Sequence, residues 1–193
     1  TYVQVEQRPI GDAGYESWVR NLQQGQLYAG DGRSHFLKFS VNGQSSGAAD
    51  VELSAPGTVV VKVLVAARLE PEITPETEAL RTARSAEWVW GWHLEKARLG
   101  ASRDVAVELV VNGIAVDKVA IVADGTLREL DFRVSIERSS WVAVRIMPSG
   151  HTHPIFVCVE DKPVRASRRS AQWCRMCVDK VWEVKSPFIR AKE

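Results

Sequence analysis

Apolar and polar residues alternate along most of the chain, which is the pattern of β-strands that bury one face. The longest alternating run, residues 58–69, places on one side Val59, Val61, Val63, Val65, Ala67 and Leu69. The same pattern recurs at residues 37–41, 105–111, 116–122 and 130–136. Shorter apolar runs follow at residues 141–147 and 154–159. The chain is therefore predicted to be mainly β.

Asparagine-glycine and aspartate-glycine pairs separate several of these strands and are strong turn signals. Asn42-Gly43 follows the first strand, and Asn112-Gly113 and Asp124-Gly125 predict two consecutive hairpins. Helical patterns do not alternate with the strands. We therefore predict an antiparallel β-sandwich of the immunoglobulin-like (Ig-like) type rather than a parallel α/β sheet.

Helical periodicity is expected at the two ends of the chain. A short helix is predicted from Asp12 to Gln24, ended by Gly25. Near the C-terminus, after a cap at Ser167 or Ser170, apolar residues recur at spacings of three and four, which indicates an amphipathic helix. Its apolar stripe is expected to pack on the sandwich. The acidic, proline-containing stretch 70–78 is interpreted as a surface excursion without a role.

Composition narrows the possible functions. A chain of 193 residues with 45% hydrophobic content suits one main core. Its 25 Lys plus Arg and 24 Asp plus Glu give a net charge of +1, so we expect no nucleic-acid partner. No apolar stretch approaches the roughly 20 residues of a spanning helix, so we expect no membrane insertion.

The first candidate chemistry is a metal site formed by Cys174 and Cys177 with His151 and His153, because thiolates and imidazoles are suitable zinc ligands. Both cysteines, however, fall on the apolar stripe of the predicted helix. A free cysteine there behaves as a small hydrophobic residue, so burial of both thiols is the favoured expectation. A redox role would need a preceding βαβ-type unit, which the pattern does not contain.

The second candidate is the loop 30–35, which presents Asp31, Arg33 and His35 within five residues and could bind an anion or border an active site. It does not have the spacing of a phosphate loop. The alternative is a polar turn in which Arg33 pairs with a nearby acid.

The third candidate is a tryptophan cluster. Trp88, Trp90 and Trp92 would lie on one side of an extended segment and, with Trp141, could form a platform for sugars or bases. Packing or an interdomain contact is the favoured interpretation. The chain contains neither the motif of a serine nucleophile elbow nor an H-E-x-x-H sequence, so no catalytic residue is predicted.

Four segments resemble the C-terminal portion of CehA/McbA-type metallohydrolases of the polymerase and histidinol phosphatase (PHP) superfamily. They are residues 28–35 (YAGDGRSH), 107–113 (VELVVNG), 136–143 (IERSSWVA) and 163–174 (PVRASRRSAQWC). The resemblance implies a catalytic barrel with divalent metal ions upstream of this chain, and no cofactor within it. The H-x-H pair of His151 and His153 lies too late in the order of segments to be the metal motif of the barrel.

On this resemblance, residues 1–33 are a strand and helix left from the catalytic domain, residues 34–165 form the sandwich, and residues 166–193 form the C-terminal helix and tail packed on it. The chain would then be a non-catalytic accessory domain whose partner is the catalytic domain of the same polypeptide. Asp31, Arg33 and His35 would border the substrate entrance. The alternatives are a ligand-binding sandwich that uses Trp88, Trp90 and Trp92, and a zinc-binding module.

Overall fold

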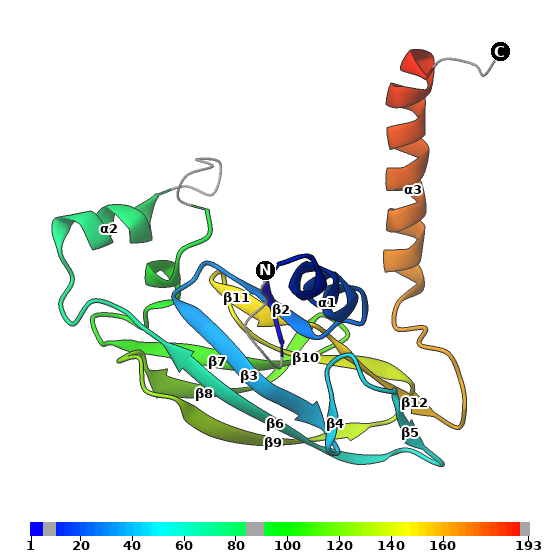
Figure 1. Ribbon diagram of the computed structural model, residues 1–193, viewed down its shortest axis with the longest axis horizontal. Coiled ribbons are helices and arrows are strands. Elements are labelled where there is room, and N and C mark those ends of the chain that lie inside the picture. Colours follow the sequence, from blue (N-terminus) through cyan, green and yellow to red (C-terminus); the bar gives the residue numbers. More distant parts are fainter. Residues whose placement is uncertain (6–10, 84–90, 190–193) are drawn as a thin grey trace.

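The computed structural model describes residues 1–5, 11–83 and 91–189. Within them the chain forms two β-sheets that share one hydrophobic core (Figure 1). The structure confirms a mainly β chain with antiparallel sheets and is consistent with a β-sandwich. The Ig-like type stays a prediction.

Strand β10 lies at the centre of the larger, eight-stranded sheet. One of its edges pairs with β7, and the other is shared by β11 and β12. Beyond β11 come β2 and β1, beyond β12 comes β5 in parallel, and β8 pairs with β7. The strands are β1 (Tyr2–Val3), β2 (Leu27–Gly30), β5 (Val51–Leu53), β7 (Asp104–Val111), β8 (Ile114–Val122), β10 (Ser140–Ile146), β11 (Gly150–Thr152) and β12 (Ile155–Val159).

The smaller sheet has four strands in the order β4-β3-β6-β9. They are β4 (Gln44–Ser45), β3 (Ser34–Val41), β6 (Gly57–Ala67) and β9 (Arg128–Ile136). The long alternating run forms β6, and its inward residues Val59, Val61, Val63 and Val65 are at most 1% exposed. They belong to the same core as Val105, Val107 and Leu109 of the larger sheet.

The predicted boundary between residues 33 and 34 falls inside this architecture. Strand β2 pairs with β11 through Tyr28, Ala29 and Gly30, and β1 pairs with β2. Strands β1 and β2 thus extend the larger sheet, and the division of the chain at residue 33 stays a prediction of the resemblance.

One of the two predicted hairpins is confirmed. The turn at Asn112-Gly113 joins β7 and β8, which pair along their length. The second prediction is wrong, because β8 lies in the larger sheet and β9 pairs with β6 in the smaller one. The turn at Asp124-Gly125 therefore crosses between sheets, and Asp124 is held there by Arg128 at 2.8 Å.

The helices are α1 (Gly11–Gln23), α2 (Pro75–Thr82) and α3 (Arg168–Lys185), with short 3-10 turns η1 (Leu94–Ala97) and η2 (Ser186–Phe188). Helix α2 lies partly in the acidic stretch interpreted as an excursion. It begins with a capping box, because the Thr74 hydroxyl accepts from the Thr77 amide and Thr77 Oγ1 accepts from the Thr74 amide. Pro75 at the first helical position agrees with this start. None of the described helices is long and apolar enough to cross a membrane.

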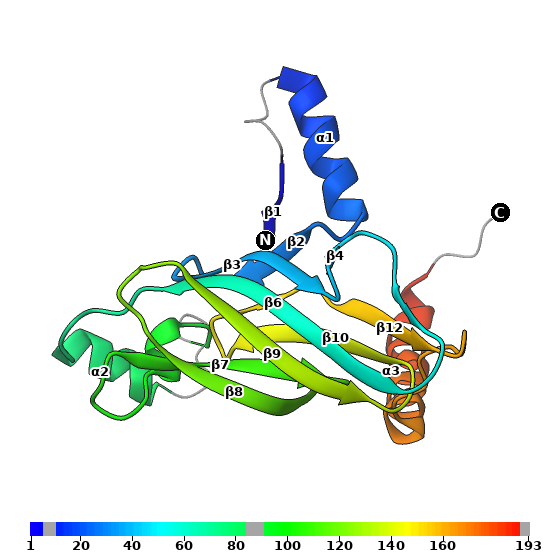
Figure 2. The same cartoon turned by 90° about the horizontal axis from the view of Figure 1, so that it is seen from below.

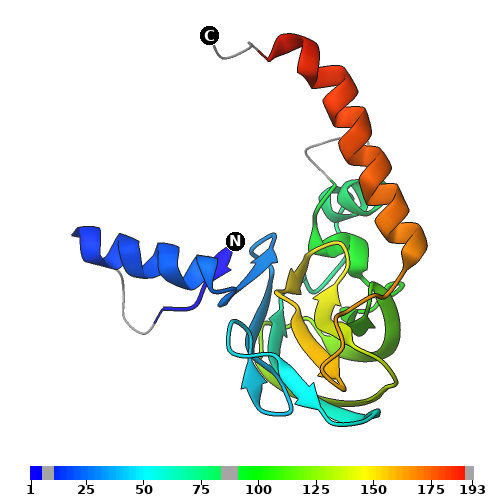
Figure 3. The ribbon, with the colours of Figure 1, turned by 90° about the vertical axis from the view of Figure 1, so that its right-hand side faces the viewer.

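Helices α1 and α3 project from the sandwich in different directions (Figures 2 and 3). No residue of either helix is buried. For α3 this differs from the expected packing on the sandwich: its N-cap Ser167 and its amphipathic pattern are as predicted, but its apolar residues are not buried against the core.

A buried ion pair follows α2 and was not predicted. Glu95 and Arg98 have fully buried side chains, and both carboxylate oxygens accept from the guanidinium at 2.7 Å. Arg98 also donates to the carbonyls of Glu70 and Ser102. This pair ties η1 to the segments on either side of it.

Glu95→Ala is expected to lower the free energy of unfolding by about 3–5 kcal/mol, because it leaves the Arg98 charge buried without its partner. Asp131→Ala is the control. It removes the acid of an exposed pair with Lys62, 3.7 Å apart, and should cost less than about 1 kcal/mol. Urea denaturation of both variants measures the difference, and equal losses would contradict the prediction.

Candidate functional site

The Asp31 carboxylate organises the loop between β2 and β3. Oδ1 accepts from the Arg33 amide at 2.9 Å and from the Ser149 hydroxyl at 2.7 Å, and Oδ2 accepts from the Leu94 amide at 2.8 Å. Ser149 Oγ also lies 2.6 Å from Ser34 Oγ, and both serines are buried. Asp31 therefore acts as a structural anchor that joins the loop to the turn before β11 and to η1.

Arg33 and His93 lie on one side of this anchor. The Arg33 guanidinium is 3.8 Å from the Glu70 carboxylate, and both side chains are about half exposed, so the expected pairing with an acid is present but weak. His93 Nδ1 accepts from the Glu95 amide at 3.1 Å. Burial, followed by the nearby Arg33 charge, lowers the pKa of His93.

His35 belongs to a separate aromatic cluster with Tyr28 and Tyr2. The Tyr28 hydroxyl lies 2.7 Å from His35 Nδ1, and the Tyr2 and Tyr28 rings stack with centroids 4.8 Å apart. Burial, and then the neighbouring Tyr2, raises the pKa of Tyr28 to about 12. Tyr28 thus stays protonated at neutral pH. The structure thus separates the three predicted residues. Asp31 is the anchor, Arg33 forms a cationic rim together with His93, and His35 belongs to the aromatic cluster.

A groove of about 730 Å³ lies beside the aromatic cluster, between the β1–β2 edge of the larger sheet and the β3–β4 edge of the smaller one. Its lining includes Tyr2, Leu27, Phe36, Phe39 and Lys38. This volume is within the range of small-molecule pockets, which is roughly 300–1,000 Å³. No local sequence pattern predicted the groove, because its walls come from two sheets.

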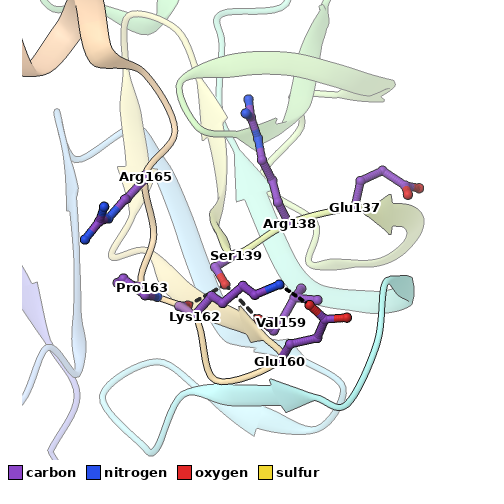
Figure 4. Close-up of a pocket in the computed structure, with 8 residues that line it drawn as sticks. All are labelled: Glu137, Arg138, Ser139, Val159, Glu160, Lys162, Pro163 and Arg165. Carbon is purple, nitrogen blue, oxygen red and sulfur yellow. Dashed lines mark hydrogen bonds and ion pairs between the residues drawn. The ribbon is translucent and has the colours of Figure 1, made fainter.

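A second hollow, of about 340 Å³, lies where the chain leaves β12 for α3 (Figure 4). The buried Ser139 hydroxyl donates to the Lys162 carbonyl at 2.5 Å and accepts from the Val159 amide at 2.8 Å. Glu160 and Lys162 form an ion pair across the same turn. These contacts fix the start of the segment that carries α3, which gives Ser139 a structural role.

The metal candidates do not converge on a site. No group of three His, Cys, Asp or Glu residues that could hold a metal ion occurs within residues 1–5, 11–83 and 91–189. The expectation that both thiols are buried is wrong, since Cys174 is exposed and Cys177 is half-buried on the projecting α3. His151 lies exposed in β11, and His153 is half-buried just after it.

The tryptophan cluster is described only in part. Trp88 and Trp90 lie outside the described residues. Trp92 is 79% exposed and directly precedes His93, which places it beside the cationic rim. Trp141 is half-buried in β10.

No known protein family matches this chain, and a search of curated proteins finds no match. The similarity to CehA/McbA-type metallohydrolases therefore stays a prediction.

Asp31→Ala is expected to lower the free energy of unfolding by roughly 1–3 kcal/mol, because the Leu94 amide and the buried Ser149 hydroxyl lose a charged acceptor. Asp117→Ala is a matched control, since this exposed carboxylate accepts from the adjacent Lys118 amide at 2.7 Å, and its loss should change stability by less than about 0.5 kcal/mol. Chemical denaturation compares the two, and an unchanged stability of Asp31→Ala would show that Asp31 is not an anchor.

The free energy of unfolding is also expected to decrease as the pH is lowered, because of His153. A Cβ at Gly25 would lie 2.6 Å from its Nε2, so the ring packs closely on the end of α1. Burial, and then His151, lowers the pKa of His153. The folded state thus favours the neutral ring, so this contribution is present above the unfolded pKa of about 6.5 and is lost as pH falls through the folded value. Denaturation at several pH values should show that His153→Gln loses less free energy of unfolding at low pH than the unmodified chain. The same pH dependence in both would exclude this role of His153.

Proposed function

We propose that this chain is a non-catalytic accessory β-sandwich that docks on a neighbouring catalytic domain of the same polypeptide through α1 and α3. The observation that carries the proposal is the state of these helices, which project from the sandwich without a single buried residue. An apolar face of this extent marks an interaction surface.

Helix α3 supports the proposal most strongly. Its exposed apolar side chains are between 50% and 68% accessible and include Trp173, Met176, Val178, Val181, Trp182 and Val184. Three of them, with Cys177, Lys185 and Ile189, line a shallow apolar groove of about 390 Å³. Most helical stability in proteins comes from packing of an amphipathic face, so an 18-residue helix in this state gains from being covered.

Helix α1 offers a second, smaller surface. Tyr15 is 67% exposed and stacks on Trp18 with ring centroids 6.4 Å apart. Trp18, Val19 and Leu22 are half-buried along the same face. The two helices project from the sandwich in different directions (Figures 2 and 3). A partner that contacts both of them is therefore held in one orientation relative to the sandwich.

The resemblance gives the partner a chemical identity. It implies that the neighbouring domain is a PHP-type, metal-dependent hydrolase that binds its own divalent metal ions, and that the sandwich is Ig-like. In that arrangement Asp31, Arg33 and His35 border the substrate entrance. The anchored loop supports such a placement, because three hydrogen bonds to Asp31 hold it in one conformation.

A ligand-binding sandwich is the second candidate. The observation that favours it is the exposure of Trp92, since an accessible indole can stack on a sugar ring or another flat ligand. In this alternative the helices contact other molecules or one another, and the binding surface lies beside η1.

Val181→Asp is expected to weaken association of the chain with the separately produced catalytic domain at least tenfold, because it places a charge at the centre of the α3 apolar face. Isothermal titration calorimetry gives the affinities. Gln172→Asp is the control, since it adds the same charge on the opposite, polar face of the helix. Equal weakening by both variants, or no association of the unmodified chain, would contradict docking through α3.

A further inference from the structure

Arg33 and His93 are 60 residues apart in the sequence but start from neighbouring points on the surface. The Arg33 amide and the amide of Leu94, which follows His93, donate to the two oxygens of one carboxylate, Asp31. These bonds are 2.9 and 2.8 Å long, so the positions of the two backbones are fixed relative to each other.

The His93 ring has a defined donor. Because Nδ1 accepts from the Glu95 amide, the proton of the neutral ring is assigned to Nε2. Nε2 is the ring nitrogen that the Glu95 amide does not contact. The neutral ring can therefore donate one hydrogen bond to a ligand, and the protonated ring adds a positive charge.

The acids near this pair are engaged elsewhere. Asp31 accepts the three hydrogen bonds that anchor the loop, and Glu95 is buried against Arg98. Within the part of the chain that the structure describes, Arg33 also pairs with Glu70, 3.8 Å from its guanidinium, in a solvated pair that contributes little. The guanidinium thus has donors available for a better placed oxyanion.

We propose that Arg33 and His93 form a binding site for an oxyanion, the carboxylate or phosphate group of a small ligand, with the indole of Trp92 beside it to contact the rest of that ligand. Arg33 supplies the planar, permanently charged donor and His93 the second, pH-dependent one. The exposed Trp92 gives the ligand an apolar surface next to the charged group. This inference concerns the chain by itself and does not depend on docking to a catalytic domain.

Binding at such a site depends on pH. The charged groups that act on His93 are the cations Arg33 and Lys96 and the anions Asp31 and Glu95. Burial and Arg33 together hold the pKa of His93 below its usual range in the unliganded chain. A bound oxyanion favours the protonated ring, so it raises this pKa, and by linkage the anion binds more tightly as pH falls through the titration of His93.

The test is an NMR titration of the whole chain with inorganic phosphate, and in parallel with acetate, at constant ionic strength. The ring signals of His93 should shift to saturation with at least one of the two anions, and the affinity should rise toward lower pH. A preference for phosphate or for acetate identifies the group that the ligand carries. Absence of a saturable shift with both anions overturns the proposal.

Three variants separate a specific site from general attraction. Arg33→Gln should weaken binding about tenfold, since it removes the charged fork. Arg138→Gln removes an equal charge at a surface position elsewhere and should leave the affinity unchanged. His93→Gln keeps a donor and should abolish the pH dependence of acetate binding, followed in this variant through the indole signal of Trp92. Equal weakening by the two arginine variants would mean that the anion responds only to net charge, which contradicts the proposal.

Discussion

The hydrogen-bond chain through Asp31 is the interaction on which the proposed oxyanion site depends. It runs from Ser34 in the smaller sheet through Ser149, next to the larger sheet, to a carboxylate that also holds the start of η1. Removal of buried acceptors is costly, because each donor then loses its partner away from water. A single side chain thus couples both sheets to the segment that presents Trp92 and His93.

The two terminal helices, α1 and α3, are not needed to complete the hydrophobic core. The sandwich core is closed by its own valines, leucines and phenylalanines, so it needs no apolar surface from α1 or α3. No residue of either helix is buried, and the apolar side chains of α3 in particular remain exposed. This separation of a self-sufficient core from projecting helices is the physical basis of the proposal that the helices dock on a neighbouring domain.

The sequence predicted the local structure better than the tertiary arrangement. Period-two alternation located β6 because every second residue of a half-buried strand faces the core. The same reasoning failed at Asp124-Gly125, since a turn signal does not specify which sheet the next strand joins. It also failed for α3, because the apolar stripe of a helix indicates that this face can pack against a partner but does not identify the partner.

The candidate site was predictable only in part, for a related reason. Arg33 and His35 stood out as a polar loop, but their division into two surfaces depends on contacts with Tyr28 and Asp31. The bond from Leu94 to Asp31 spans 63 residues and that from Ser149 spans 118, and no local pattern encodes such separations. His93, which completes the cationic rim, was therefore missed.

The branching of the larger sheet at β10 separates the starting points of the two terminal helices. Helix α1 is inserted between β1 and β2, on the branch that leaves β10 through β11, whereas α3 follows β12 on the other branch (Figure 1). The distance between the bases of the two helices is therefore set by the width of the sheet across this fork. For a partner that contacts both helices, the distance between the two contact surfaces would be set by the sandwich and not by the partner.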